Sequence, residues 1–369
     1  MKPKVLIFGS STKLAGSELK ILEFIRRFDK DKLSVEAVFL YESEIIDKKI
    51  QLLDVKVQCF DIKQRGFIRT LAAIKKHLVK EKYDYIYCFG YKVNFIVRLL
   101  QLFNNKTRIL TAVESTKKDL NILAALFDKI TSFKVSKYIC VSESAQKVLM
   151  DRNKINKEKT VVIKNGIDLD KFNNGKDKSE VIKGLKLNIN EDDFVVGCIG
   201  NFRKAKGQDI LLEACNKLKK YKDIKYVFVG DGELREDYEK LISNYGIEEK
   251  VIMLGVREDI QDIIKIFNIM VVPSRWEGFG LVVLEAMASH IPVIASKVDG
   301  LLELVKDGFN GMFFENENSE DLSNKILILK DNKFIRDSLA DKAYKYTIKP
   351  YDVEIMVREI ENFILSENR

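Results

Sequence analysis

The sequence predicts an α/β protein built from two doubly wound parallel-sheet domains. Short apolar runs of strand length alternate with helix-length segments along the chain, an order typical of parallel sheets covered by helices. This alternation is interrupted once, by a polar, lysine-rich stretch after the turn at Asn165 and Gly166, and then starts again. A chain of 369 residues is also too long for one hydrophobic core.

The first domain is expected to open with a buried strand at 4–10, followed by a helix. In that helix the apolar residues recur at helical spacing: Leu19, Leu22, Phe24, Ile25 and Phe28. Further strand-like runs lie at 35–41, 55–62, 83–90, 108–114, 137–142 and 161–164. An amphipathic helix is expected over 67–82, with one apolar side formed by Ile68, Leu71, Ile74 and Leu78.

The second domain repeats the pattern. Its strand-like runs lie at 193–200, 225–232, 250–255, 268–274, 291–296 and 311–314, with helix-length segments between them. Residues 351–366 carry apolar residues at helical spacing and predict a last amphipathic helix. We place the domain boundary at 170/171, because the turn and the polar stretch fall there.

Charge is distributed unevenly along the chain. Residues 1–170 carry a net charge of +13, whereas residues 171–369 carry −5. The first half therefore suits an anionic partner, such as a membrane surface or a lipid pyrophosphate, although a lysine-rich solvated surface would explain the same count. Nucleic acid is not expected, because no motif combines basic and aromatic residues.

Composition also indicates the cellular compartment in which the protein is expected. No run of about 18 apolar residues is present, so no membrane-spanning helix is expected. The five cysteines lie in apolar segments without CxxC spacing, which favours reduced thiols. We expect a cytoplasmic protein, with peripheral contact to the inner face of the cell membrane as an open alternative.

The stretch PSRWEGFGLVVLEAMASHIPVIAS, residues 273–296, carries the strongest functional pattern. Glu277 and Glu285 lie eight positions apart, and Gly278 and Gly280 stand between them before an apolar helical run. A helix that starts at a glycine loop presents unpaired N–H groups, which suit a phosphate. Glu285, one turn inside the helix, and Glu277, on the loop, could each reach sugar hydroxyls.

A basic loop opens the second domain. Gly200 and Gly207 bracket Arg203, Lys204 and Lys206, and a helix-length segment follows. Cations beside the carboxyl end of a strand would neutralise a diphosphate leaving group. The alternative is an ordinary solvated basic loop.

The string EGFGLVVLEAMA, followed by PVIAS, resembles the E-x7-E signature of retaining GT-B glycosyltransferases of the family 4, group 1 type. This resemblance implies the GT-B fold, in which two Rossmann-like domains face each other and the C-terminal helix crosses back to the first domain. It implies an acceptor-binding domain at 1–170 together with 350–369, and a nucleotide-sugar-binding domain at 171–349.

The resemblance also assigns the site. It implies catalytic roles for Arg203, Lys206, Glu277 and Glu114. It implies donor contacts for Gly16, Ser17, Gly230, Val256, Arg257, Gly278, Phe279, Gly280, Leu281 and Glu285.

Two positions depart from the family pattern. Asn201 stands where the arginine of the basic loop is usual, so we transfer that role to Arg203, with Lys204 as an alternative. Glu114 stands where many members carry a histidine, and neither histidine of this chain lies there. Glu114 is therefore either the substitute for that histidine or a carboxylate at the rim of the site.

The implied reaction is transfer of a hexose or N-acetylhexosamine, with retained anomeric configuration, from a nucleotide diphosphate sugar. A UDP-linked donor is expected from the frequencies within the family, and a saccharide or polyprenyl-diphosphate-linked acceptor fits cell-surface polysaccharide synthesis. No metal is expected, because no DxD motif appears on a strand-end loop and the cations and the helix end supply the charge.

Two other functions remain open at this stage. One is a nucleotide-sugar epimerase of the same fold, and the other is a non-catalytic nucleotide-sugar-binding protein. A dinucleotide-dependent oxidoreductase is disfavoured, because the first glycine loop, GSSTKLAG, lacks GxGxxG spacing.

Overall fold

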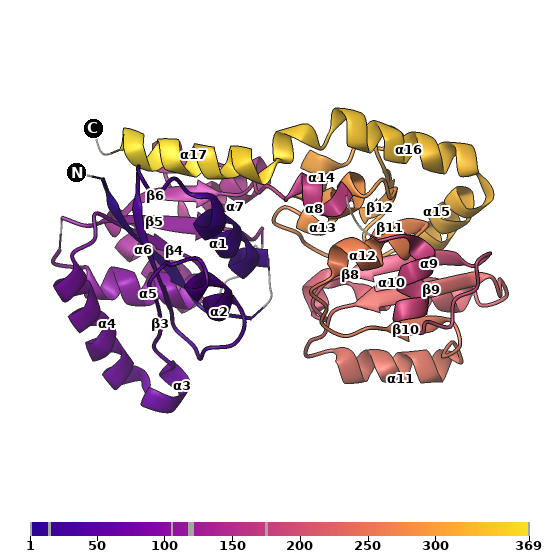
Figure 1. The fold of residues 1–369 in the computed structure, drawn as a ribbon, viewed down its shortest axis with the longest axis horizontal. Coiled ribbons are helices and arrows are strands. Elements are labelled where there is room, and N and C mark those ends of the chain that lie inside the picture. Colours follow the sequence, from indigo (N-terminus) through magenta and orange to yellow (C-terminus); the bar gives the residue numbers. More distant parts are fainter. Residues whose placement is uncertain (1, 14–15, 105, 117–121, 174–175, 368–369) are drawn as a thin grey trace. The chain divides into compact units, whose positions relative to one another are not determined.

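The computed structural model describes residues 2–13, 16–104, 106–116, 122–173 and 176–367 (Figure 1). The chain divides into two compact units, and each is described by itself. Unit 1 comprises Met1–Asn165 and Val353–Arg369, and unit 2 comprises Gly166–Asp352. Residues 166–170 and 350–352, which the sequence analysis assigned to the first domain, thus belong to unit 2.

Unit 1 contains a seven-stranded parallel sheet in the order β3-β2-β1-β4-β5-β6-β7. Its strands are β1 (Lys4–Gly9), β2 (Ser34–Phe39), β3 (Val57–Cys59), β4 (Tyr85–Cys88), β5 (Arg108–Val113), β6 (Val135–Cys140) and β7 (Thr160–Val162). The order reverses between β1 and β4, and ligands of doubly wound sheets bind at the carboxyl ends of strands beside such a reversal. The predicted parallel sheet is confirmed.

Helices cover both faces of this sheet (Figure 1). They are α1 (Gly16–Arg27), α2 (Ile46–Gln51), α3 (Ile62–Arg65), α4 (Phe67–Glu81), α5 (Tyr91–Leu100), α6 (Ile122–Thr131), α7 (Glu143–Asn153) and the C-terminal α17 (Val353–Ser366). The apolar side of α17 joins the same core as α1 through Met356, Ile360 and Ile364. The last helix of the chain therefore packs on the first unit, as predicted.

The predicted packing of α4 is wrong at one position. Ile74 and Leu78 are buried as expected, but the first turn contributes Thr70 to the buried stripe, and Ile68 is 81% exposed. The buried positions 70, 74 and 78 recur every four residues, and Ile68 is rotated by about 200° from Thr70 around the helix axis. Periodicity alone placed Ile68 on the packed side, because it could not set the rotation of the helix against the sheet.

Unit 2 contains a six-stranded parallel sheet in the order β10-β9-β8-β11-β12-β13. Its strands are β8 (Phe194–Ile199), β9 (Ile224–Val229), β10 (Val251–Met253), β11 (Ile269–Val272), β12 (Val293–Ser296) and β13 (Met312–Phe314). Its helices are α8 (Leu169–Asn173), α9 (Lys178–Gly184), α10 (Gln208–Lys217), α11 (Arg235–Tyr245), α12 (Ile260–Ile263), α13 (Leu281–Ala288), α14 (Leu301–Leu304), α15 (Ser319–Asp331) and α16 (Lys333–Tyr346). The order reverses between β8 and β11, so the loops after these two strands adjoin.

Across the described residues, no helix combines the length and the apolar character that a bilayer crossing requires.

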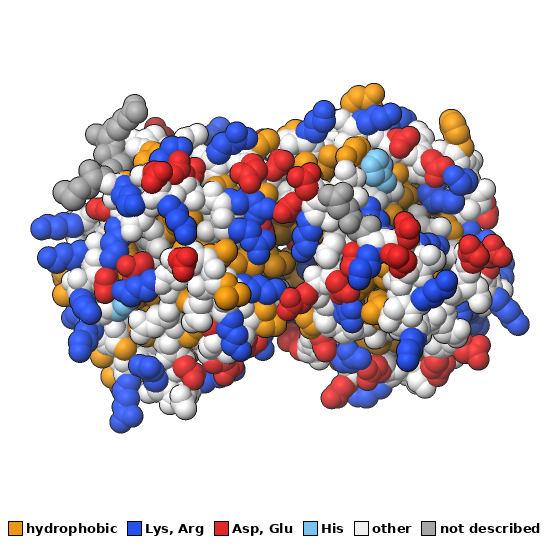
Figure 2. All heavy atoms as spheres, in the orientation of Figure 1, with side chains coloured by type: hydrophobic (Ala, Val, Ile, Leu, Met, Phe, Trp, Pro, Cys, Tyr) orange, Lys and Arg blue, Asp and Glu red, His pale blue; other side chains and the backbone are white. Residues whose placement is uncertain are grey.

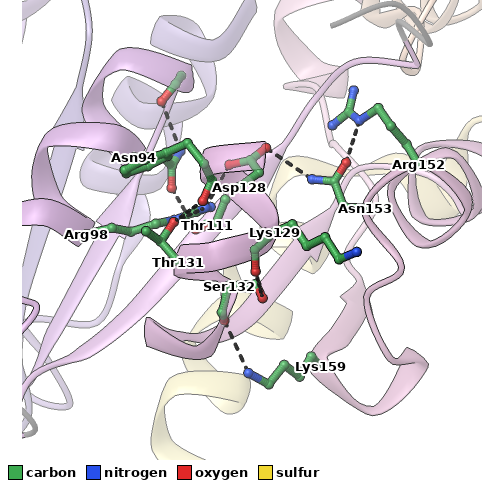
Figure 3. A network of polar contacts seen from close by, with 12 residues as sticks. Asn94, Arg98, Thr111, Asp128, Lys129, Thr131, Ser132, Arg152, Asn153 and Lys159 are labelled. Carbon is green, nitrogen blue, oxygen red and sulfur yellow. Dashed lines mark hydrogen bonds and ion pairs between the residues drawn. The ribbon is translucent and has the colours of Figure 1, made fainter. Parts of the chain in front are cut away.

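A buried ion pair ties three helices of unit 1 together (Figure 3). Arg98 of α5 is 2% exposed, and its Nη1 donates to Asp128 Oδ1 of α6 at 2.8 Å. The other oxygen of Asp128 accepts from Asn153 Nδ2 of α7 at 3.1 Å. Because removal of either charge leaves the other one buried, this network is sensitive to single substitutions.

We expect Arg98→Met to lower the free energy of unfolding by about 3–5 kcal/mol, because Asp128 would remain buried without its cation. The free energy of unfolding of the double variant Arg98→Met/Asp128→Leu should fall much less than that of the single variant. Urea unfolding followed by circular dichroism measures both. Arg26→Met, which removes an exposed ion pair with Glu23, is the matched control and should change stability by less than about 1 kcal/mol.

Candidate active site

Three neighbouring strands of unit 2 are followed by glycines. The Gly200 N–H donates to Val229 O at 2.9 Å, and the Gly230 N–H donates to Gly255 O at 2.8 Å. Gly230 has φ +131°, and a Cβ added there would lie 2.2 Å from Gly200 O. The carboxyl ends of β8, β9 and β10 therefore form an edge of bare backbone, which lets a ligand approach the main chain closely.

The basic loop lies at this edge, between β8 and α10. Gly207 has φ +64°, and a Cβ there would lie 2.1 Å from Pro273 O, so the loop presses directly on the segment after β11. The side-chain amide of Gln208 donates to Asn201 O at 3.1 Å and Gly200 O at 3.3 Å. Arg203 and Lys204 are exposed, whereas Lys206 is half-buried.

Lys206 and Glu277 are brought together. The Lys206 amine forms an ion pair with Glu277 Oε2, and the Ser274 hydroxyl donates to the same oxygen at 3.2 Å. Both side chains are partly covered, at 30% exposed for Lys206 and 13% for Glu277. Two residues that stand 71 positions apart in the sequence thus share one contact.

The loop between Glu277 and α13 is packed through glycines. The Gly300 N–H donates to Glu277 O at 3.1 Å, and a Cβ on Gly300 would lie 2.5 Å from Gly278 O. Gly280 caps α13 with φ +97°. Phe279 is buried and Leu281 half-buried. The first N–H groups of α13 lack intrahelical carbonyl partners, and the helix dipole adds positive potential, so this end suits an anion.

Glu285 lies in the second turn of α13 and is half-buried. Loss of hydration raises the pKa of its carboxyl to about 7, against a lowering influence from Lys171 of α8. Near neutral pH this side chain can therefore either accept or donate a hydrogen bond, which suits a hydroxyl-rich ligand. Its charged neighbour in the structure is Lys171, and we find no direct contact with Lys206 among the described residues.

Two of the residues expected to contact the donor, Val256 and Arg257, follow Gly255 after the end of β10. Val256 is 57% exposed. Arg257 is held by two hydrogen bonds to Asp259, at 2.8 Å and 2.6 Å. Because Gly255 O accepts from Gly230 N, these residues begin beside the glycine edge.

Three predicted residues lie in unit 1. Gly16 and Ser17 open α1, and the Ser17 hydroxyl donates to Glu18 Oε2 at 2.8 Å. Glu114 follows directly after β5 and is half-buried. Loss of hydration raises the pKa of Glu114 to about 7; Lys20 and Ser17 oppose this rise, and Glu18 reinforces it.

Arg275 is not among the residues predicted from the sequence. Its guanidinium donates to both carboxylate oxygens of Asp209, at 2.9 Å and 2.6 Å, and its backbone N–H donates to Ala205 O at 2.8 Å. These contacts join the loop after β11 to the basic loop and to the start of α10. Interaction with Asp209 raises the pKa of Arg275. An arginine next to the E-x7-E string was the available signal.

Within the described residues, no group of three or more His, Cys, Asp or Glu side chains is arranged to hold a metal ion.

Two family models match the chain. The model for Glycosyltransferase Family 4 matches residues 16–171, and the model for Glycosyl transferases group 1 matches residues 183–349. The chain is a family 4 glycosyltransferase. The family and the enzyme class predicted from the E-x7-E string are therefore confirmed.

Relatives of known sequence agree with this placement. The glycosyltransferase is 29% identical over 282 residues to the UDP-Gal:α-D-GlcNAc-diphosphoundecaprenol α-1,3-galactosyltransferase of Escherichia coli, covering 73% of this chain and 72% of that protein. It is 31% identical over 278 residues to a 41.2 kDa protein from the cps region of Klebsiella pneumoniae, covering 71% of this chain and 72% of the other.

Solved structures support the fold. HepE of Anabaena, solved with UDP and glucose, matches with a TM-score of 0.86 at 22% identity, over 99% of this chain and all of that one. Sucrose-phosphate synthase of Thermosynechococcus elongatus matches with a TM-score of 0.85 at 17% identity, over 100% of this chain and 99% of that one. The glycosyltransferase therefore has the predicted GT-B fold.

Arg275→Met should lower the free energy of unfolding of unit 2 by about 2 kcal/mol, because it leaves the half-buried Asp209 without two charge-assisted hydrogen bonds. Urea unfolding followed by the fluorescence of Trp276, the next residue, is the measurement. Lys217→Met removes an exposed ion pair with Glu320 from the far end of the same helix as Asp209, and it should have little effect. Equal effects of the two substitutions would contradict a specific role for Arg275.

Proposed function

We propose that this enzyme transfers a hexose or N-acetylhexosamine from a UDP-linked donor to a glycan or lipid-linked acceptor, with retention of the anomeric configuration. The observation that carries the proposal is the Lys206–Glu277 ion pair beside the bare glycine edge and the start of α13. A cation, a carboxylate and a helix N-terminus at one end of a sheet match the parts of a sugar diphosphate: the pyrophosphate charge and the sugar hydroxyls.

The relatives narrow the substrate class. The name of the Escherichia coli relative gives UDP-Gal as its donor and a GlcNAc-diphosphoundecaprenol as its acceptor. A Bacillus anthracis relative, 30% identical over 174 residues, is named N-acetyl-α-D-glucosaminyl L-malate synthase. These names support a UDP-linked hexose or N-acetylhexosamine as donor, and we assign the donor to unit 2 and the acceptor to unit 1.

In the proposed reaction the diphosphate competes with Glu277 for the Lys206 amine. Binding would transfer the lysine to the phosphates and leave the Glu277 carboxylate to orient sugar hydroxyls. Arg203 and the first N–H groups of α13, near Phe279, Gly280 and Leu281, would stabilise the leaving group as well. Glu285 is assigned to ribose hydroxyls and Glu114 to the transferred sugar.

The chemical step is written as a displacement on one face of the sugar. The acceptor hydroxyl oxygen forms the new bond to C1 as the bond from C1 to the diphosphate oxygen breaks. The acceptor proton passes to the departing diphosphate, which leaves as UDP. We propose that no metal is required, because Lys206, Arg203 and the helix end supply the positive charge at the diphosphate.

A panel of UDP- and GDP-sugars, assayed with a lipid-diphosphate-linked saccharide acceptor, tests the function. We expect UDP release and glycosylated acceptor with a UDP-sugar, unchanged by EDTA, and an α linkage by NMR from an α-linked donor. Binding without product would instead identify a nucleotide-sugar-binding protein. Conversion of the donor to an isomer without acceptor would identify an epimerase.

Lys206→Ala and Glu285→Ala should each lower turnover by about 10²- to 10³-fold, as expected when one electrostatic group is lost from such a site. Circular dichroism should show the fold intact. Lys333→Ala, in the exposed Lys333–Asp337 pair of α16, is the matched control and should turn over normally. Near-normal rates for both site variants would overturn the site assignment.

We also propose that unit 1 contacts anionic membranes through the α3–α4 corner, defined as Arg65, Phe67, Ile68 and Arg69. Phe67 is 51% and Ile68 81% exposed, and both arginines are exposed beside them. Lys and Arg side chains gather along this edge of unit 1 (Figure 2). Apolar side chains between cations match the interface of an anionic bilayer, where a lipid-linked acceptor would lie.

Flotation with vesicles tests this surface. The enzyme should float with phosphatidylglycerol-containing vesicles at low salt, and less with neutral vesicles or at high salt. Phe67→Ser/Ile68→Ser should reduce flotation severalfold, whereas Phe334→Ser, at an 83% exposed position of α16, should not. Equal flotation on neutral and anionic vesicles would refute the proposal.

A further inference from the structure

A lysine side chain is buried inside unit 1. Lys20 of α1 is 4% exposed, and its Nζ reaches no hydrogen-bond acceptor in the described part of the chain. Burial of an ammonium group costs much free energy unless an opposite charge lies nearby or the group loses its proton. The presence of Lys20 at this position therefore needs an explanation.

The surroundings of Lys20 form an ionisable cluster at the carboxyl end of the sheet. Leu110 and Ala112 of β5 pack in the same core as α1, and Glu114 continues that alternation one residue beyond the strand. Lys20 and Glu114 interact electrostatically with each other and with groups of three elements, which are Ser17 and Glu18 of α1, Tyr87 of β4 and Cys140 of β6. The Tyr87 hydroxyl is also buried and reaches no partner among the described residues.

Lys20 supplies the basic side chain of this cluster. Glu18 adds a second carboxylate, while Tyr87 and Cys140 are neutral, because loss of hydration raises the pKa of Tyr87 well above its ordinary value and that of Cys140 to about 12. Loss of hydration lowers the pKa of Lys20, and Glu114 opposes that shift. The charge on Glu114 thus depends on a balance between burial and Lys20.

We infer that Lys20 is a positioning residue of this glycosyltransferase: its buried amine favours the ionised form of the neighbouring Glu114 carboxyl, which burial disfavours. The coupling between the two side chains stands on the structure of unit 1 alone. Its consequence for catalysis rests on the proposed function, in which Glu114 contacts the transferred sugar.

The coupling predicts a pH dependence of stability with a definite sign. The pKa of Glu114 in the fold, about 7, lies above its ordinary value of 4.5. The stability contributed by the protonated carboxyl is therefore complete below about pH 4.5 and is lost as the pH rises through about 7. Lys20→Met removes the amine that lowers this pKa, so the stability of the variant should go on decreasing up to a higher pH.

The test compares unfolding in urea from pH 5 to 9 for four proteins: the wild type, Glu114→Gln, Lys20→Met and the double variant. When Lys20 is present, the difference in the free energy of unfolding between the proteins with Glu and with Gln at position 114 should change with pH and level off near pH 7. In the Lys20→Met proteins, which lack the amine, the pH at which this difference levels off should rise by about 1 pH unit or more. Leu22→Met, a volume-conserving change at a buried position of the same helix, is the control and should leave the levelling point unchanged. If Lys20→Met does not fold, Lys20→Gln replaces it.

Activity provides the second readout. The value of kcat/KM should change with pH around pH 7. This transition should shift to a higher pH in Lys20→Met and be absent in Glu114→Gln. An unchanged levelling point in the stability measurement overturns the inference, whatever the activity does. A shifted levelling point with an unshifted activity transition supports the coupling and refutes instead the proposed contact of Glu114 with the sugar.

Discussion

The ion pair between Lys206 and Glu277 is the central contact of the proposed donor site. It joins a loop after β8 to a loop after β11, the two strands between which the sheet of unit 2 reverses its order. Gly207 also allows its loop to press on Pro273, and Arg275 joins the loop after β11 to the start of α10 through Asp209. The two loops that carry the cation and the carboxylate are thus joined by further contacts besides the ion pair.

Glycines act in this site by removing side chains. At Gly230 and Gly300 a Cβ would overlap a carbonyl oxygen of the neighbouring loop, at Gly200 and Gly278 respectively. The neighbouring backbone segments can therefore abut without a side chain between them. A diphosphate needs many hydrogen-bond donors in a small volume, and close-packed main chain with a helix N-terminus supplies them at little conformational cost.

The pKa values of two carboxyl groups, Glu285 in unit 2 and Glu114 in unit 1, are raised for the same reason. Loss of hydration raises the pKa of each to about 7, and a single lysine in each unit acts against the shift. Their neighbours differ, since Glu285 faces Lys171 of a short surface helix, whereas Glu114 faces a lysine that is itself buried. The charge of Glu114 is consequently tied to the packing of α1.

The sequence alone determined the two parallel sheets, the strand positions and the glycine-bearing loops, because these follow from local apolar periodicity and from motifs contained in short segments. It also placed Lys206 and Glu277 in one functional class through the E-x7-E string and the basic loop. Only the tertiary structure showed that the two side chains touch, that Arg275 grips Asp209, that Ile68 faces outward and that Lys20 is buried beside Glu114. Those facts depend on how strands distant in sequence lie side by side and on the rotation of each helix against its sheet, which local spacing does not encode.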